Sequence, residues 1–370
     1  RRHRTTKNLP RMNPTAAPHA AAPTTGYTIA AQTHAVLPHA GSAQTNNPAD
    51  VTVIIVNWNA GPLLHHCLEH LRRQTLQPAQ VILIDNASSD GSWELPDELK
   101  RWNALRLQRM DSNLGFAAGN NHALQQCKTE FVALLNPDAF AATHWLEHLL
   151  AAANEHPQAA AFGSRQLCHE TPGTLDGTGD CYHASGLAWR EHHHQTQTPA
   201  HLQAREIFAP CAAAALYRRK ALVAAGGFDE SYFCYHEDVD LGFRLRLQGH
   251  TARYVPQAVV HHVGSATTGG QRSDFATYHG HRNMVWTFVK NMPNPLLWAL
   301  LPLHLAANLT SVAWLALRGQ GGTALRAKWH ALRGLGAVMQ KRRAIQAQRQ
   351  ASAATIWNAL DKSWWPRPKR

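Results

Sequence analysis

The sequence predicts an α/β domain followed by a helical C-terminal extension, and three observations support this. From Val51 onward, short apolar runs typical of buried strands alternate with longer runs of helical spacing. Polar and acidic clusters stand where those strands end, as they do in open sheets. Beyond residue 277 the chain becomes basic and rich in tryptophan at helical spacing. We therefore expect a disordered segment over 1–50, an α/β domain over 51–277 and a helical region over 278–370.

The elements of the α/β domain follow in order. A chain of 370 residues that is 44% hydrophobic can bury one large core or two modest ones. Strands of the buried type and helices of amphipathic spacing alternate through its first part. The predicted strands are "VTVIIV" (51–56), "VILI" (81–84), "LRLQRM" (105–110) and "FVALL" (131–135), and the predicted helices are "GPLLHHCLEHLRRQ" (61–74) and "FAAGNNHALQQC" (116–127).

The formal charge of +12 is concentrated at the two ends of the chain. Residues 1–50 carry 5 Lys and Arg against 1 acid, residues 51–317 carry 19 against 22, and residues 318–370 carry 12 against 1. A nucleic-acid-binding domain should carry its phosphate-binding face on the folded part. Because that part is slightly acidic, we expect no nucleic-acid partner.

The N-terminal 50 residues are dominated by Ala, Thr, Pro, His and Asn without apolar periodicity, which predicts disorder. No continuous apolar stretch follows the opening arginines, so we expect no signal peptide and a cytoplasmic location. The six cysteines lie far apart without a CxxC pair. They predict reduced thiols rather than a disulfide framework or a zinc site.

Three polar clusters follow predicted strands: "IDNASSDGS" (84–92), "NLGFAAGNN" (113–121) and "LLNPDA" (134–139). Each has a plain interpretation as a turn or a helix cap. Asp85, however, stands at a strand end, where a carboxylate can also accept the imide N–H of uracil or thymine. Asp138 stands at another strand end, and with a distant carboxylate and a histidine it would make a magnesium or manganese site.

The stretch "YFCYHEDVDLGFRLRLQGH" (232–250) places Glu237, Asp238 and Asp240 at the start of a predicted helix. Acids there complement the helix dipole and cap free N–H groups, which is the interpretation we favour for Asp240. Rings beside a carboxylate exclude water and make its charge state matter. Phe233 and Tyr235 are therefore expected either to line a ligand pocket or to pack in the core.

The C-terminal region contains 23 residues without formal charge, 295–317, which is long enough to span a bilayer. His304, Asn308 and Pro302 interrupt it, and the following segment alternates basic and apolar residues at helical spacing. Six of the twelve tryptophans fall between residues 298 and 365. We favour a helix in the membrane interface over a spanning helix. A helical subdomain with a solvated basic face is the alternative.

Six ordered motifs together resemble family 2 glycosyltransferases with the GT-A fold. They are "VIIVNWN", "IDNASSDGS", "NLGFAAGN", "LLNPD", "GGFDESYFCYHEDVDLGFRLRLQG" and "VVHHVGSAT". The most similar subgroup is that of the bacterial rhamnosyltransferase-like enzymes of cell-surface polysaccharide assembly, such as O-antigen and lipopolysaccharide. The resemblance covers residues 51 to about 290 and implies a GT-A nucleotide-diphospho-sugar transferase fold.

The resemblance also implies where the donor nucleotide binds. Asp85 matches the acid of the family that contacts the base. The residues that match positions near the base and ribose are Asn57 and Asn59 of the first strand end, and Asn113 and Asn120 of the glycine-containing loop.

A Mg²⁺ or Mn²⁺ ion is implied at the donor diphosphate. Asp138 matches the last acid of the DxD motif of the family, whereas the first position is Asn136, which leaves the site one charge short. His262 matches a histidine that completes the metal or diphosphate site. The adjacent His261 leaves the register between the two open.

Asp238 matches the catalytic base of the Glu-Asp motif, with Glu237 as its neighbour. The implied reaction is an inverting transfer from a nucleotide-sugar donor, expected to be dTDP-rhamnose, to a lipid-linked or glycan acceptor at the cytoplasmic membrane face. UDP- and GDP-sugars remain alternative donors. A processive synthase is disfavoured, because no QxxRW sequence and no set of long apolar helices is present. A non-catalytic membrane- or nucleic-acid-binding module is the alternative of another class, and a degenerate, inactive transferase domain is a further one.

Overall fold

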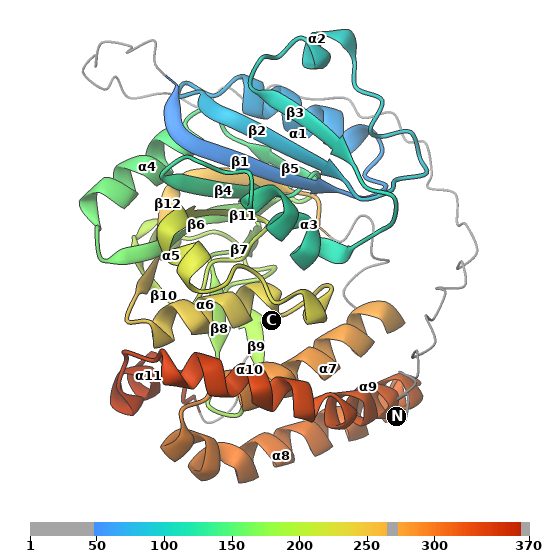
Figure 1. Cartoon of the computed structure of the whole chain (residues 1–370), viewed down its shortest axis with the longest axis vertical. Coiled ribbons are helices and arrows are strands. Elements are labelled where there is room, and N and C mark those ends of the chain that lie inside the picture. The colour runs from blue at the N-terminus through green and yellow to red at the C-terminus, as the bar shows by residue number, and fades with distance from the viewer. Residues whose placement is uncertain (1–47, 265–272, 364–370) are drawn as a thin grey trace, which may run out of the picture. The chain divides into compact units, whose positions relative to one another are not determined.

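The computed structural model describes residues 48–264 and 273–363 (Figure 1). The predicted disorder of 1–50 falls almost wholly outside these residues. In the first half of the chain the elements are β1 (Ala49–Asn57), α1 (Pro62–Arg72), β2 (Pro78–Asp85), α2 (Asp97–Lys100), β3 (Leu105–Arg109), α3 (Gly115–Leu124), β4 (Phe131–Leu135), β5 (Ala139–Ala141), α4 (Trp145–Glu155), β6 (Ala159–Cys168), β7 (Leu175–Gly177), β8 (Asp180–Tyr182) and β9 (Ala188–Arg190).

The second half of the described chain continues with two short 3₁₀ turns, three strands and seven helices. They are η1 (Pro199–Leu202), β10 (Arg205–Ile207), β11 (Ala214–Arg218), α5 (Arg219–Ala224), η2 (Glu230–Tyr232), α6 (Glu237–Leu247), β12 (Thr251–His262), α7 (Asp274–Asn291), α8 (Asn294–Leu317), α9 (Gly321–Arg333), α10 (Leu335–Ala347) and α11 (Ala353–Ala359). The strands predicted from the first apolar runs are confirmed, and "FVALL" coincides with β4.

One mixed sheet carries the fold, in the order β10-β12-β6-β11-β4-β1-β2-β3. Strands β4, β1, β2 and β3 are parallel, so their carboxyl ends meet at one edge. Strand β11 pairs antiparallel with both β4 and β6, while β12 runs parallel to β6. The short strand β5, which begins just after Asp138, pairs with the end of β12. This pairing brings two segments more than a hundred residues apart to the same sheet edge.

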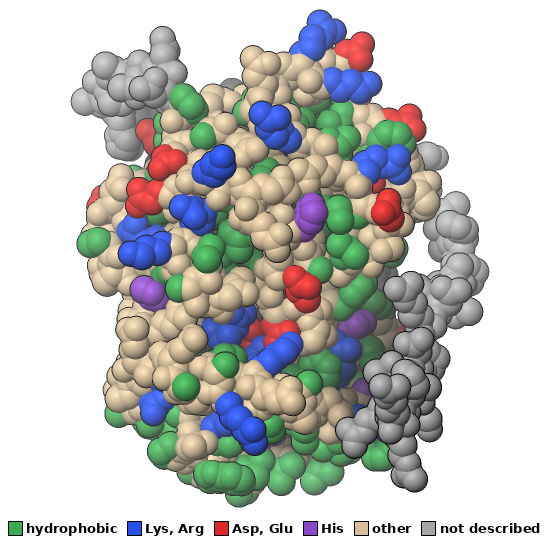
Figure 2. Space-filling view, in the orientation of Figure 1, with side chains coloured by type: hydrophobic (Ala, Val, Ile, Leu, Met, Phe, Trp, Pro, Cys, Tyr) green, Lys and Arg blue, Asp and Glu red, His purple; other side chains and the backbone are tan. Residues whose placement is uncertain are grey.

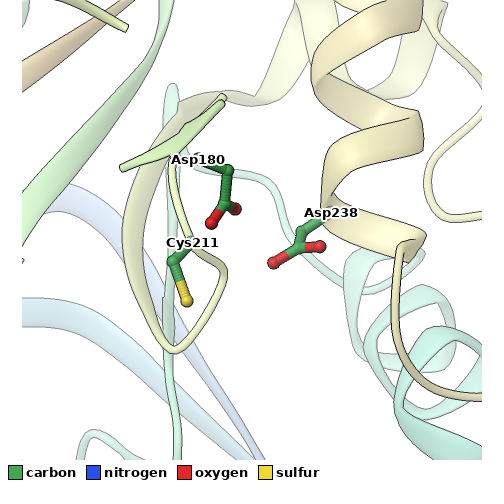
Figure 3. A group of neighbouring side chains, drawn as sticks. All are labelled: Asp180, Cys211 and Asp238. Carbon is green, nitrogen blue, oxygen red and sulfur yellow. The ribbon is translucent and has the colours of Figure 1, made fainter. Parts of the chain in front are cut away.

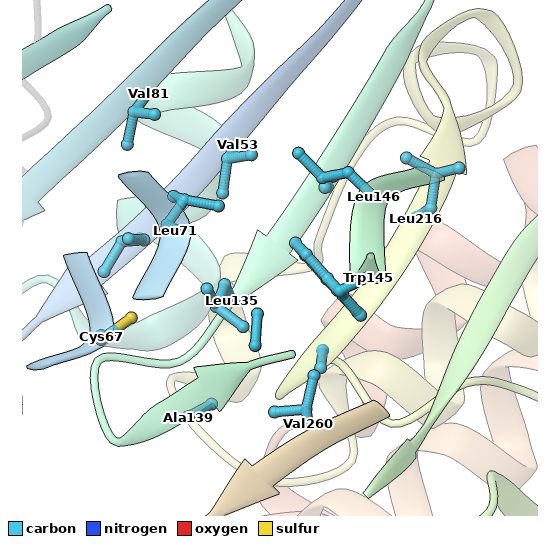
Figure 4. Close-up of a cluster of buried hydrophobic side chains, with 14 of the residues drawn as sticks. Val53, Cys67, Leu71, Val81, Leu135, Ala139, Trp145, Leu146, Leu216 and Val260 are labelled. Atoms are coloured by element: carbon cyan, nitrogen blue, oxygen red, sulfur yellow. The ribbon is translucent and has the colours of Figure 1, made fainter. Parts of the chain in front are cut away.

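Helices cover both faces of the sheet, which explains why its strands are continuously apolar. Residues of β1 alternate between the two resulting cores, because successive side chains of a strand point to opposite faces. Val53 and Ile55 pack against α1 and α4 in one core, and Ile54 packs in the other with α3, α5 and α6. Figure 4 shows the first core, where Trp145 of α4 lies among side chains from several strands. These two cores hold the strand ends rigidly in place.

The helices α7–α11 form a group beside the sheet domain (Figure 1). Helix α7 runs through the predicted boundary between residues 277 and 278 and packs against α6. A third apolar core joins α6 to the C-terminal helices, and its members include Phe243, Phe288 and Ile356. The C-terminal helices therefore share a core with the helix that carries Asp238.

Helix α8 is long and apolar enough to cross a membrane by length and composition, and it is the one such helix among the described residues. Only Leu297, His304 and Leu315 of its 24 residues are buried. Hydrophobic side chains gather along the lower edge of Figure 2, where Figure 1 places α8. The helix thus exposes apolar surface along most of its length.

Candidate active site

The carboxyl ends of β1 and β2 place Asn57 beside Asp85. The Asn57 side-chain amide donates to Asp85 Oδ1 at 2.9 Å, and also to the hydroxyls of Ser88 and Ser92 at 3.1 and 2.8 Å. Asp85 is fully buried, and its second oxygen lies 3.4 Å from Nε of the half-exposed Arg109. Asn57 and Asp85 are thus held by hydrogen bonds to the loop that follows β2, and the half-exposed Arg109 side chain lies beside Asp85.

The other three residues that were predicted to contact the nucleotide, Asn59, Asn113 and Asn120, each make hydrogen bonds within the protein. Asn59 holds the same loop, because its Oδ1 accepts from the Ser89 amide at 2.8 Å. Asn113 accepts from the Gly115 amide and from the side chain of Asn86, at 2.9 and 3.1 Å. Asn120 is buried, and its side chain donates to the Phe116 carbonyl of its own helix at 2.9 Å.

At the next strand end, three side chains form a chain of contacts across β5, β7 and β12. His262 Nε2 lies 3.2 Å from Asp138 Oδ1, and His262 Nδ1 lies 2.7 Å from Asp176 Oδ2. Asn136 contacts the same imidazole at 3.4 Å, and Arg190 pairs with Asp176 from the other side. His262 is buried beside Asp138, whereas His261 is exposed on the opposite face of β12. Of the two histidines, His262 is the one that the structure brings to Asp138.

This cluster has the donor set that a hard divalent cation uses. Although burial opposes its charged form, the carboxylates of Asp138 and Asp176 raise the pKa of His262 to about 9. A cation between Asp138 and His262 would replace that proton. Asp176 would then orient the imidazole through its Nδ1, as the carboxylate partners of metal-bound histidines do. The residues present therefore fit Mg²⁺ or Mn²⁺ bound by Asp138 and His262, with substrate diphosphate oxygens completing the ligands.

A second acidic cluster surrounds Asp238 at the first turn of α6. Asp238 Oδ2 accepts from the Ala212 amide at 3.2 Å. Asp180, from the start of β8, and Cys211 each offer an atom, and these and the Asp238 carboxylate all lie within 4.8 Å of one another. Figure 3 shows the two carboxylates pointing toward one another. Asp180 Oδ2 is buried and has no hydrogen-bond partner among the described residues.

Burial decides the charge of this cluster. It raises the pKa of Asp180 well above the usual range, and the charge of Asp238 raises it further. Burial likewise raises the pKa of Asp238, and it raises that of Glu237 together with the neighbouring Asp238 charge. The buried Cys211 thiol also has a raised pKa, so it stays protonated. In the absence of a cation, the carboxyl groups of Asp180 and Asp238 therefore favour sharing a proton.

The turn that leads into Asp238 is conformationally strained. Phe233, Tyr235 and His236 all have positive φ angles, of 65°, 67° and 67°. Such conformations cost free energy in residues other than glycine and persist where surrounding contacts hold them. The side-chain amide of Asn283 on α7 donates to three carbonyls of the turn, at 2.8–3.1 Å.

On the opposite side of the turn, the Phe116 amide donates to the Phe233 carbonyl at 2.9 Å. A Cβ at Gly115 would come within 2.7 Å of that carbonyl oxygen, which explains the glycine in the loop. The rings of Phe233 and Tyr235 are half-buried and contact Phe275 of α7.

Asp240 lies in the first turn of α6 as expected, but it binds side chains across the domain rather than serving only as a cap. It is fully buried and pairs with Lys290 of α7 at 2.8 Å and with Arg244 at 2.9 Å. Lys290 also reaches Asp229 at 2.5 Å. These buried ion pairs join α6 to α7 and so hold both ends of the turn that leads into Asp238.

Sequence analysis did not single out three residues of this site: Asp176, Asp180 and Arg190. The stretch "TLDGTGD" (174–180) spaces two acids around glycines, which was the available signal. The strands that carry them, β7, β8 and β9, are only three residues long each. Nothing in so short a run distinguishes a strand that delivers a carboxylate from a surface turn.

The mixed sheet gathers carboxylates at the ends of its strands, which is where open α/β sheets bind their ligands. Residues 52–224 match the model of the family described as glycosyl transferase family 2. Over 251 residues, the chain is 30% identical to N-acetylglucosaminyl-diphospho-decaprenol L-rhamnosyltransferase of Mycobacterium tuberculosis, which covers 61% of this chain and 80% of that protein. The chain belongs to glycosyl transferase family 2.

Two further similarities agree with this. The O-antigen chain rhamnosyltransferase RfbN of Salmonella typhimurium is 26% identical over 228 residues, or 62% of this chain and 70% of that protein. The crystal structure of GalNAc-T7 with UDP, GalNAc and Mn²⁺ superposes with a TM-score of 0.53 and 16% identity, covering 66% of this chain and 48% of that one. The predicted GT-A fold and the rhamnosyltransferase-like resemblance are confirmed, and the protein is a glycosyltransferase rather than a non-catalytic module.

Proposed function

We propose that this protein transfers rhamnose, with inversion, from dTDP-rhamnose to a hydroxyl of a lipid-linked acceptor in cell-surface glycan assembly. The acceptor oxygen forms a bond to the anomeric carbon while the bond from that carbon to the diphosphate oxygen breaks. The hydroxyl proton passes to Asp238, and dTDP leaves with the bonding electrons. The observation that carries the proposal is the 30% identity over 80% of the length of a rhamnosyltransferase.

Donor binding is assigned to the edge formed by β1, β2 and the loop before α3. Asp85 would accept the imide N–H of the base, with Asn57 and Asn59 holding its loop in place. Asn113 and Asn120 would lie near the ribose, Asn113 through its contacts with Asn86 and Gly115. This assignment requires Arg109 to move from Asp85, which its half-exposed side chain permits.

Diphosphate binding is assigned to Asn136, Asp138 and His262. A Mg²⁺ or Mn²⁺ ion bound there supplies positive charge next to the leaving diphosphate. Asp176 and Arg190 keep the His262 ring in place through its Nδ1. With Asn136 in place of an acid, the site has one carboxylate fewer than a DxD motif offers. We therefore expect the ion to bind with the donor rather than before it.

Asp238 is assigned as the general base, with Glu237 as its neighbour. A base works best when its pKa lies near the working pH, and burial moves the Asp238 pKa upward from the range of an ordinary carboxyl. The Ala212 amide holds its carboxylate in one orientation. The strained turn at 233–236 places this carboxylate at the start of α6 rather than inside it.

Association with the cytoplasmic membrane face is supported by the surface of the C-terminal helices. On α8, Trp298, Leu309 and Leu317 are 68%, 72% and 89% exposed. Arginines lie over exposed tryptophans at two places, Arg318 on Trp314 and Arg333 on Trp329. Such pairs suit the headgroup level of an anionic membrane. An acceptor anchored in lipid would then meet the enzyme at this surface.

The test measures release of nucleoside diphosphate from dTDP-rhamnose and from a panel of UDP- and GDP-sugars. Each reaction contains Mg²⁺ or Mn²⁺ and a membrane extract as the acceptor source. We expect turnover from dTDP-rhamnose, and a loss of about 10²- to 10⁴-fold in Asp238→Asn, because the base is removed while the shape is kept.

The matched control is Asp97→Asn, which changes an exposed acid of α2 and should leave the rate unchanged. Turnover of only a UDP- or GDP-sugar would correct the donor and leave the transferase reaction standing. A wild-type rate in Asp238→Asn would remove Asp238 as the base.

A further inference from the structure

A cavity of about 660 Å³ lies between α7, α8 and strand β9, and the donor site does not use it. Its walls are mostly apolar, with Leu187, Met284, Trp314 and Leu315 among the lining side chains. Its volume is that of a typical small-molecule site. One lining residue, His236, belongs to the strained turn and precedes Asp238 by two positions. Two residues of chain span at most roughly 7 Å, so the backbone at His236 lies close to the backbone at Asp238.

Basic side chains line this cavity or lie next to it: His236, His281 and Arg318 are lining residues, and Lys328 of α9 contacts His281 from outside the lining. The Nδ1 atoms of His236 and His281 are both buried and have no hydrogen-bond partner among the described residues. Lys328 of α9 donates from Nζ to the His281 carbonyl at 2.8 Å. Over the ranges that the structure describes, no carboxylate forms an ion pair with Lys328.

Burial lowers the pKa of all three basic groups, His236, His281 and Lys328. Burial, and then the charge of Lys328, lower the pKa of His236 to about 4 and that of His281 to about 3. Burial lowers the pKa of Lys328 to about 7. Buried basic groups without acidic partners are held neutral, and an anion placed among them restores their protons and gains charge-assisted hydrogen bonds.

We propose that this cavity binds the prenyl-diphosphate part of the lipid-linked acceptor, with His236, His281 and Lys328 on the phosphates and the α7 and α8 side chains on the hydrocarbon. An amphiphile with an anionic head matches both the apolar walls and the unpartnered basic groups. Its head would lie beside the turn that leads into Asp238. The hydrocarbon would leave along α8, whose exposed apolar side chains continue to the surface. The inference rests on the proposed function and adds the acceptor site to it.

The chain offers a clean way to block the cavity. Gly280 lies on α7 and lines the cavity, and a Cβ added there meets no atom within 4 Å. Gly280→Leu therefore adds a side chain at the cavity from a position where the Cβ has open space, and leucine is a better helix former than glycine, so the helix should be kept. Gly336→Leu is the matched control, because Gly336 lies on α10 with equally open surroundings and away from the cavity.

Binding is measured with farnesyl diphosphate on the full chain, without divalent metal and with saturating dTDP, so that the donor site is not the one observed. We expect farnesyl diphosphate to bind wild type about tenfold or more tightly than either farnesol or inorganic diphosphate. Gly280→Leu should weaken it about tenfold, whereas Gly336→Leu should not. Lys328→Met should weaken farnesyl diphosphate and inorganic diphosphate and leave farnesol unchanged.

Wild-type binding of farnesyl diphosphate by Gly280→Leu would overturn the inference, and so would equal affinity for farnesol. Binding to phosphatidylglycerol vesicles without any affinity for farnesyl diphosphate would assign the basic groups to general membrane contact and overturn it as well. Failure of the proposed function is a separate result, because dTDP-rhamnose turnover by wild type does not depend on the outcome of these binding measurements.

Discussion

Replacing Asn283 by alanine removes the side chain that holds the strained turn before α6. Its amide has two N–H donors, and these serve three carbonyl oxygens of the turn at 2.8–3.1 Å. At about 1 kcal/mol for each hydrogen bond, the ordered turn loses about 2 kcal/mol relative to an opened one. That shifts the opening equilibrium about 30-fold. Three residues with positive φ then have less to hold them in place.

Amide hydrogen exchange measures this opening directly, because the amides of a segment that opens locally exchange in proportion to the population of the open state. We expect amides of the 233–236 segment to exchange about 30-fold faster in Asn283→Ala, and turnover to fall while the KM for the donor stays unchanged. Asn358→Ala, on an exposed face of α11, is the control. Unchanged exchange in the turn, or a raised donor KM at full turnover, would refute the assignment of Asn283 to this role.

Two further predictions concern buried charge. Lys290→Met removes the cation that Asp229 and Asp240 share and leaves them only Lys341 and Arg244. It should lower the free energy of unfolding by about 3–5 kcal/mol in urea titrations, with part of the loss recovered when Asp240→Asn is added. An equal loss in the single and double variants would show that the charges do not interact. Asp180→Asn removes an acid whose folded pKa is raised, so the wild type loses stability as pH rises through that pKa and the variant does not. Thermal unfolding should therefore show the wild type losing more stability than Asp180→Asn between pH 4 and pH 8. An equal loss in the two proteins would show that Asp180 does not titrate with a raised pKa.

The parts of the fold that could be predicted are those whose information is local. Strand β4 coincides with "FVALL" because both faces of that strand are buried and polar residues bound it on each side. The positions of Asp85 and Asp138 at strand ends could be predicted for the same reason, because each follows a short, buried apolar strand. Alternation along β12 decides which of its two adjacent histidines faces Asp138, and the pairing of β12 with β5 and β6 sets that alternation. From the sequence motif alone, either His261 or His262 could face Asp138.

The parts that could not be predicted depend on pairings between distant segments. Asp180 meets Asp238 only because a three-residue strand is placed beside the loop before β11. Asp240 has the position of an ordinary first-turn acid, and its pairing with Lys290 becomes visible only when α7 lies against α6. Helix propensity and capping rules contain no information on such partners.

Asn283 and Lys290 are seven residues apart on α7, which places both on one face of the helix two turns apart. One secures the turn before Asp238 and the other neutralises acids on either side of it. The sheet domain is therefore not a self-sufficient module. A chain shortened before α7 would keep the six motifs that resemble the family and lose the contacts that hold the turn before Asp238. Any exchange of C-terminal helices between relatives has to carry an amide and a cation at this same spacing.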